Sequence, residues 1–219
     1  MQLAGVIINL NGSLIEYDEI RYDTFNDILS EFSQKISRFQ WENEYRFLET
    51  KDIIRDLVID RDLNIDEKKF QVLFDSIEKK TIKFYGVPIV EGLKNFLSYL
   101  KLKNIKVLIA SDFTKEFTKF LISNSDLPKL EFVSREEYDK TKPYSDCYEV
   151  CLRKLNLSYD KIIVFENTIS GIVGSQKVTP NVCGVNFYET QNLYKVKIIK
   201  NIKNYNELDF FDFVNQRLN

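Results

Sequence analysis

The chain of 219 residues contains no histidine. Histidine is the usual acid, base and metal ligand near neutral pH, so Ser-His-Asp catalysis, Cys-His catalysis and His-ligated zinc are excluded. Any proton transfer must fall to Asp, Glu, Lys, Tyr or Cys side chains. Cysteine is also scarce: the chain has three, Cys147, Cys151 and Cys183. An odd number predicts free thiols rather than a disulfide framework.

Long apolar runs and a surplus of one charge are absent too. No run of about 18 apolar residues occurs, so the sequence predicts no membrane-spanning helix. The first residues lack the basic start and small-residue cleavage site of a secretory signal. The 31 Lys and Arg nearly balance the 33 Asp and Glu, which argues against a dedicated nucleic-acid binder. We therefore expect a cytoplasmic protein with neither membrane nor nucleic acid as a partner.

The chain does contain short apolar runs that alternate with helical patterns. Strands are predicted at 3–10, 106–110, 161–165 and 182–187. Helices are predicted at 92–103, 115–123 and 145–155. Near-continuous apolar strands alternating with helices are typical of a parallel sheet covered on both faces. The predicted fold class is therefore α/β, with a Rossmann-like parallel sheet core.

One stretch, residues 15–86, interrupts this alternation with helical patterns only. Its apolar residues recur every three to four positions among many charges. We therefore expect an α/β core domain of residues 1–14 and 87–219 and an inserted all-helical cap domain of residues 15–86. The alternative is that these helices pack directly on the sheet.

Polar residues follow several of the predicted strands. Open α/β sheets carry their sites in the loops at the carboxyl ends of strands. Ser111 offers a hydroxyl, and Lys142 a positive charge, to a phosphate group. Glu166 ends an apolar strand, where a carboxylate needs a cation or a hydrogen-bond donor. Each residue alone also fits an ordinary turn, cap or solvated surface, but their order along the chain is more specific.

That order resembles the haloacid dehalogenase superfamily, and within it the β-phosphoglucomutase-like phosphatases and phosphomutases with a helical cap. Residues 142–146 (KPYSD) resemble the family's K-P-x-P-D motif, with Ser145 in place of proline. Residues 164–172 (VFENTISGI) resemble its V-F-E-D-S-x-x-G-I motif. The resemblance implies a phosphorylated small-molecule ligand, Mg²⁺ as cofactor, and Ser111 and Lys142 as phosphate-binding residues.

The family's catalytic aspartates are replaced in this chain. Its D-x-D-G motif supplies the nucleophile and the acid/base, and these positions are Asn9 and Asn11. Its Glu-Asp pair, which helps to hold Mg²⁺, is Glu166 and Asn167. The resemblance thus places the metal site at Asn9, Asn11, Glu166 and Asn167, in a weakened or lost form.

Each of these replacements removes a chemical function that phosphate hydrolysis needs. A neutral carboxamide is a poor nucleophile and forms no stable acyl phosphate. Asn11 has no titratable proton for a leaving group, and Mg²⁺ prefers charged oxygens. General drift towards asparagine is not the simplest cause, because 16 Asp remain beside the 18 Asn. One substitution is enough to disable such a site, so three favour a natural replacement.

We therefore expect a phosphatase-like or phosphomutase-like protein that is inactive or strongly impaired and retains binding of a phosphorylated ligand. Whether it is an enzyme stays open at this point. One alternative is a regulatory or structural pseudoenzyme with a protein partner, for which the aromatic residues of the cap domain would form the surface. These are Tyr17, Tyr22, Trp41, Tyr45 and Phe47. A second alternative is a weakly active Mg²⁺-dependent phosphatase in which Glu166 or Asp112 replaces the nucleophile.

Overall fold

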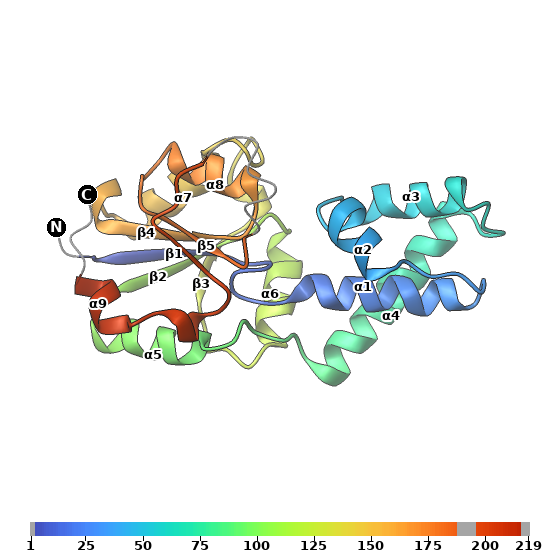
Figure 1. Ribbon diagram of the computed structural model, residues 1–219, viewed down its shortest axis with the longest axis horizontal. Helices are drawn as coiled ribbons and strands as arrows, with labels where there is room; N and C mark the ends of the chain where they lie inside the picture. The colour runs from blue at the N-terminus through green and yellow to red at the C-terminus, as the bar shows by residue number, and fades with distance from the viewer. Residues whose placement is uncertain (1–2, 188–195, 216–219) are drawn as a thin grey trace. The chain divides into compact units, whose positions relative to one another are not determined.

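The computed structural model describes residues 3–187 and 196–215. The chain forms two compact units, Met1–Glu16 with Pro88–Asn219, and Tyr17–Val87 (Figure 1). We call them the core unit and the helical unit. The parts of the predicted core domain at 1–2, 188–195 and 216–219 lie outside the described residues.

The core unit is built on a parallel sheet with the strand order β3-β2-β1-β4-β5-β6. The strands are β1 (Gly5–Asn9), β2 (Lys106–Ala110), β3 (Glu131–Val133), β4 (Ile162–Glu166), β5 (Val182–Val185) and β6 (Lys200–Ile202). The sequence does not predict β3, because it has three residues and its apolar pattern is too short. The alternating basic and apolar residues of 195–203 favour a strand with one solvated face, and β6 lies within that segment. In this order β1 lies between β2 and β4, near the middle of the sheet.

Helices cover both faces of this sheet. They are α5 (Leu93–Leu102), α6 (Lys115–Ser123), α7 (Asp146–Leu155), α8 (Ile169–Gln176) and α9 (Phe210–Asn215). Short 3₁₀ turns occur at η2 (Arg135–Glu137), η3 (Tyr159–Lys161) and η5 (Tyr205–Glu207). Figure 1 shows α7 and α8 on one face of the sheet and α5 and α9 on the other.

The period-two alternation of strand residues decides which side chains meet these helices. In β4, Ile162 and Val164 pack in the core beneath α7. The next residue of the same parity is Glu166, so the strand carries its carboxylate to the face that α7 covers. Phe165 points to the opposite face and packs against Phe96 of α5, with ring centroids 5.3 Å apart.

The helical unit contains α1 (Tyr17–Ser30), α2 (Arg38–Gln40), the π-helical turn η1 (Trp41–Tyr45), α3 (Thr50–Asp60) and α4 (Glu67–Tyr85). Its own hydrophobic core joins Phe25, Trp41, Phe70 and Phe74. Together with the parallel sheet, this helical insertion confirms the predicted α/β fold class with a helical cap. No helix in the described part of the chain is long and apolar enough to cross a membrane.

Two short connections join the units, and they run side by side within the core unit. Ile15 and Ile89 form an antiparallel bridge. The Glu16 amide donates to the Pro88 carbonyl at 2.9 Å. These bonds hold residues 15 and 16 in the core unit, so the helical unit begins at Tyr17.

Candidate functional site

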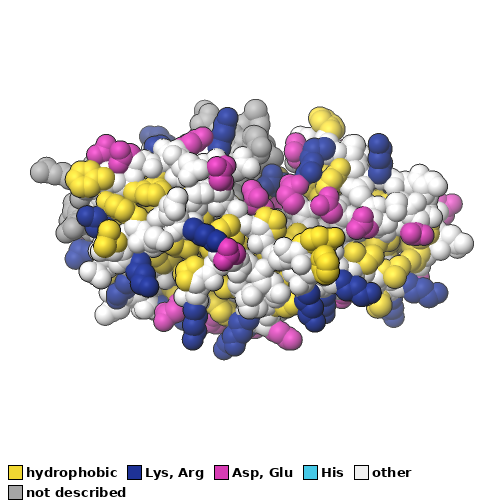
Figure 2. Space-filling model, turned by 90° about the horizontal axis from the view of Figure 1, so that it is seen from below, with side chains coloured by type: hydrophobic (Ala, Val, Ile, Leu, Met, Phe, Trp, Pro, Cys, Tyr) yellow, Lys and Arg dark blue, Asp and Glu magenta, His cyan; other side chains and the backbone are white. Residues whose placement is uncertain are grey.

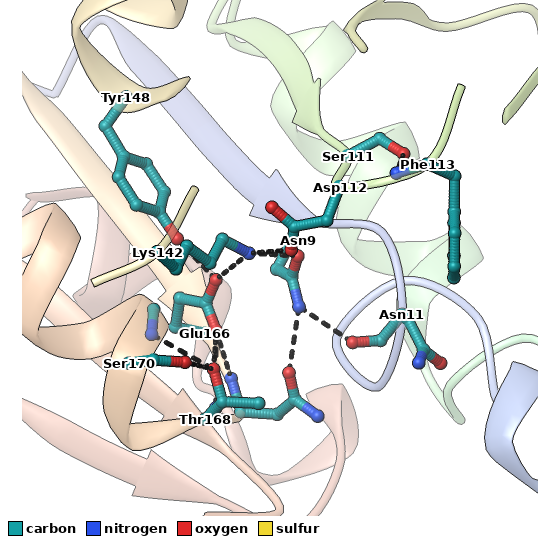
Figure 3. A network of polar contacts seen from close by, with 12 residues as sticks. Asn9, Asn11, Ser111, Asp112, Phe113, Lys142, Tyr148, Glu166, Thr168 and Ser170 are labelled. Atoms are coloured by element: carbon teal, nitrogen blue, oxygen red, sulfur yellow. Dashed lines mark hydrogen bonds and ion pairs between the residues drawn. The ribbon is translucent and has the colours of Figure 1, made fainter. Parts of the chain in front are cut away.

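Three polar side chains converge at the carboxyl edge of the sheet (Figure 3). Asn9 is the last residue of β1 and Glu166 is the last residue of β4, and these strands are neighbours. Lys142 comes from the loop before α7 and reaches both of them. The structure therefore brings together residues that lie 133 positions apart in the chain.

The Lys142 ammonium has three N–H donors and three partners. It donates to Glu166 Oε1 at 2.7 Å, to Asn9 Oδ1 at 2.8 Å and to Asp112 Oδ2 at 2.9 Å. Burial would lower the pKa of Lys142, but the Asp112 and Glu166 carboxylates outweigh burial and raise this pKa above its ordinary value. The lysine is thus charged and its hydrogen-bonding capacity is filled. Counted with its two carboxylates, the group carries one positive and two negative charges.

Glu166 is fully buried, and both of its oxygens accept hydrogen bonds. Besides Lys142, the Tyr148 hydroxyl donates to Oε1. Oε2 accepts from the Asn167 backbone N–H at 2.9 Å. A Cβ atom at residue 171 would lie 2.1 Å from the Glu166 carboxyl carbon, so Gly171 leaves the space that this side chain fills. The burial of Tyr148 and the Glu166 charge raise the pKa of the Tyr148 hydroxyl, which stays a donor.

The Asn9 amide has only one orientation that satisfies its neighbours. Lysine can only donate, so the Asn9 atom that faces Lys142 must be the oxygen. The nitrogen then donates to the Asn11 backbone carbonyl at 2.7 Å and to Asn167 Oδ1 at 2.9 Å. Figure 3 shows the side-chain amide of Asn11 pointing away from this group. A neutral amide network therefore occupies the position at which the resemblance places a nucleophile.

Gly12 leaves room for this network. Its φ is +85°, a left-handed conformation that L side chains rarely adopt. A Cβ atom there would lie 1.9 Å from Asn167 Nδ2. Both conditions require glycine after Asn11, and the missing side chain lets the loop approach Asn167 closely.

The loop after β2 contributes Ser111 and Asp112. The buried Ser111 hydroxyl lies 2.8 Å from Thr118 Oγ1 and accepts from the Phe113 N–H at 3.1 Å. Asp112 accepts from the Tyr138 hydroxyl at 2.9 Å as well as from Lys142. Burial alone would raise the pKa of Asp112, but Lys142 and Tyr138 hold it below its ordinary value. Asp112 is therefore ionised at neutral pH.

The residues present do not fit a magnesium ion. A cation here would need the Asn11 carbonyl and Asn167 Oδ1 as ligands, but the Asn9 nitrogen donates its hydrogens to both oxygens. The Glu166 carboxylate is already paired with the Lys142 ammonium. No group of three or more His, Cys, Asp or Glu able to hold a metal occurs within residues 3–187 and 196–215.

The convergence of Asn9, Lys142, Glu166 and Asn167 is thus present in the structure, and Ser111 lies on the neighbouring loop, where its hydroxyl bonds Thr118 and Phe113. Sequence reasoning missed Tyr148 and Tyr138. The only signal for Tyr148 was its place in the apolar stripe of α7, three positions before Cys151 and seven before Leu155. For Tyr138, which follows η2, the sequence offered no signal.

Residues 6–185 match the family of haloacid dehalogenase-like hydrolases. A curated relative, a probable pseudouridine-5'-phosphatase of Saccharomyces cerevisiae, is 24% identical over 186 residues, which are 76% of this chain and 75% of that protein. A putative β-phosphoglucomutase from Thermotoga maritima has a similar structure, with a TM-score of 0.84, 16% identity, and 97% and 100% of the two chains covered. An Asp-to-Asn mutant of CbbY from Rhodobacter sphaeroides, solved with xylulose-(1,5)bisphosphate, has a TM-score of 0.72 and 14% identity, with 95% and 97% covered.

Proposed function

Because the chain belongs to the haloacid dehalogenase-like hydrolase family, we propose that it is a member that binds a phosphorylated small molecule without metal and does not hydrolyse it. The observation that carries the loss of hydrolysis is the bonding of Asn9. Its oxygen is held by Lys142 and its nitrogen by two oxygens. No atom of this side chain can attack phosphorus to form a stable acyl phosphate.

The ligand class is supported by the cation that remains. Lys142 keeps its ammonium at the carboxyl edge of the sheet, where α/β folds bind ligands. The CbbY mutant shows that an Asp-to-Asn member of this fold was obtained with a bisphosphate sugar bound. For this chain, a phosphate group would meet Lys142 with no carboxylate at positions 9, 11 and 167 to repel it.

Replacement of the missing nucleophile by another carboxylate finds no support in the contacts. Glu166 is fully buried and bonded through both oxygens. Asp112 lies in the loop after β2, not in the loop after β1, and is bonded to Lys142 and Tyr138.

The test of lost hydrolysis compares the native protein with the variant Asn9→Asp/Asn11→Asp/Asn167→Asp. Both are incubated with Mg²⁺ and a generic aryl phosphate monoester, and the released alcohol is measured. We expect turnover only from the variant, because it regains the nucleophile, the acid/base and the metal ligands. Turnover by the native protein that its Asn9→Ala variant loses would overturn the proposal.

The test of ligand binding is calorimetric titration of the native protein with the same monoester in EDTA. We expect weak, saturable binding that Mg²⁺ does not improve. No heat of binding up to millimolar ester would reject this half of the proposal and leave the first half standing.

A second candidate, a protein-binding role, is favoured by exposed aromatics at the end of α4. The Phe84 and Tyr85 rings are each 80% exposed and lie 4.8 Å apart. Of the five aromatic residues that the sequence suggests for such a surface, Tyr17 and Trp41 are buried and Phe47 is 49% exposed. Figure 2 shows hydrophobic side chains interspersed with charged ones on the face seen from below.

Self-association is the form of protein binding that can be tested with the purified protein alone. Sedimentation of the native protein over a range of concentrations, beside Phe84→Ser/Tyr85→Ser, would detect it. A native protein that remains monomeric throughout counts against it.

A further inference from the structure

The two carboxylates bonded to Lys142 differ in their access to water. Glu166 is fully buried, whereas the Asp112 side chain is 44% exposed and the Lys142 side chain 7%. Asp112 is therefore the outer partner of the ammonium, and Glu166 and Asn9 are the inner ones. A ligand that arrives from solvent meets Lys142 on the side that Asp112 occupies.

Binding of an anion at Lys142 is for this reason an exchange. The ammonium has no fourth donor, so an incoming oxygen must replace one of the three present partners. The inner partners are held by further bonds, to the Tyr148 hydroxyl at Glu166 and to the Asn11 and Asn167 oxygens at Asn9. Asp112 lies in a loop, and the Tyr138 hydroxyl, 2.9 Å away, is its other side-chain partner.

We propose that Asp112 is a built-in competitor that occupies Lys142 and sets the affinity of this site for a phosphate group. This deepens the proposed function and rests on it. A carboxylate presents an anionic oxygen to the ammonium as a phosphate does, and both cannot contact the same N–H. The displaced Asp112 charge also repels the bound anion, so the native site binds phosphate weakly and releases it readily.

The Tyr138 hydroxyl is a positioning group for this competitor. It donates to Asp112 Oδ1 and also to the Ser111 carbonyl at 3.1 Å. It thereby ties the carboxylate to the end of β2 and orients Oδ2 towards Lys142. Removing the Tyr138 hydroxyl keeps every charge in place but takes one hydrogen bond away from the Asp112 carboxylate.

The experiment is titration of inorganic phosphate into the full chain by calorimetry, in EDTA at constant ionic strength. We expect Asp112→Asn to bind about 10- to 100-fold more tightly than the native protein, since one nearby negative charge is removed. Tyr138→Phe should bind about three- to tenfold more tightly, because only one hydrogen bond to the competitor is lost. The matched control is Asp126→Asn, in which the carboxylate removed is 90% exposed and pairs with Lys94; it should bind phosphate as the native protein does.

The outcomes separate this inference from the proposed function. Equal affinity of the native protein and Asp112→Asn overturns the inference and leaves the proposed function standing. Binding by Asp112→Asn alone supports the competitor and rejects phosphate binding by the native chain. Absence of binding in both overturns both. Circular dichroism melts of each variant establish that the proteins compared are folded.

Discussion

The substitution of Asn9 by aspartate measures how much the hydrogen bonds of this amide contribute to the free energy of unfolding. An aspartate would keep its bond to Lys142 but would turn a second oxygen towards the Asn11 carbonyl and Asn167 Oδ1, where two donated hydrogen bonds now lie. We expect Asn9→Asp to lower the free energy of unfolding by about 1–3 kcal/mol in EDTA. Urea unfolding followed by circular dichroism measures this change.

The matched control is Asn64→Asp, which makes the same chemical change at an exposed position. Its free energy of unfolding should stay within about 0.5 kcal/mol of the native value. If Asn9→Asp were as stable as this control, the hydrogen-bonding pattern assigned to the Asn9 amide would be incorrect.

Several residues of the site could be predicted and others could not, for a physical reason. Asn9 and Glu166 end neighbouring strands, and the carboxyl ends of parallel strands meet at one edge, so their convergence follows from the pattern. The bond between Ser111 and Thr118, or between Asp112 and Tyr138, depends on how a loop folds back. No periodicity in the sequence encodes such a contact.

Helix α4 carries a carboxylate in its buried stripe. Glu78 lies four positions after Phe74 and four before Ile82, so helical geometry places it in the hydrophobic interior. There it accepts a hydrogen bond from Tyr17 of α1. Burial raises the pKa of the Glu78 carboxyl from its ordinary 4.5 to about 7, and Tyr17 and the nearby Arg21 charge only partly offset this.

This shift gives the helical unit a pH-dependent stability. The folded-state pKa exceeds the unfolded one, so the contribution is full below about pH 4.5 and is lost as the pH rises through 7. Glutamine mimics the protonated form at every pH. We expect Glu78→Gln to be as stable as the native protein at acidic pH and more stable at alkaline pH, by up to about 3 kcal/mol.

Urea unfolding at a series of pH values from 5 to 8 measures the difference between the two proteins. Glu67→Gln, an exposed change in the first turn of the same helix, should show no such trend. A Glu78→Gln protein that is less stable than native at pH 8 would show that the ionised carboxylate stabilises the fold.

For whole elements, the sequence predicts the bounds best where polar residues flank a short apolar pattern. Strand β2 and helix α6 have the predicted bounds, Lys106–Ala110 and Lys115–Ser123. Strand β3 escapes prediction because it has three residues, of which only Val133 is buried. An edge strand pairs with one neighbour only, so its exposed residues need not be apolar.

For the molecule as a whole, the hydrogen bonds among Asn9, Asn11 and Asn167 predict that magnesium does not change the melting temperature. A ligand raises the melting temperature only by binding the folded state. We expect the native protein to melt at the same temperature in EDTA and in about 10 mM MgCl₂, whereas Asn9→Asp/Asn11→Asp/Asn167→Asp should melt several degrees higher with the metal. Differential scanning calorimetry measures both shifts.

CaCl₂ at the same concentration is the control for ionic strength and for weak binding to surface carboxylates. A rise in the native melting temperature that is specific to magnesium would contradict the fit of the site described above. The same rise in both proteins and with both cations would reflect surface binding alone.

The hydrogen bond between Asn9 and Asn167 makes the two positions unequal towards substitution. Asn9 donates this bond and Asn167 accepts it, so an aspartate at position 167 would still accept the bond, whereas an aspartate at position 9 would remove its donor. The order in which the two aspartates are introduced therefore decides what the single-substitution intermediate loses. Asn167→Asp made first keeps the bond between the two strand ends, and Asn9→Asp made first breaks it.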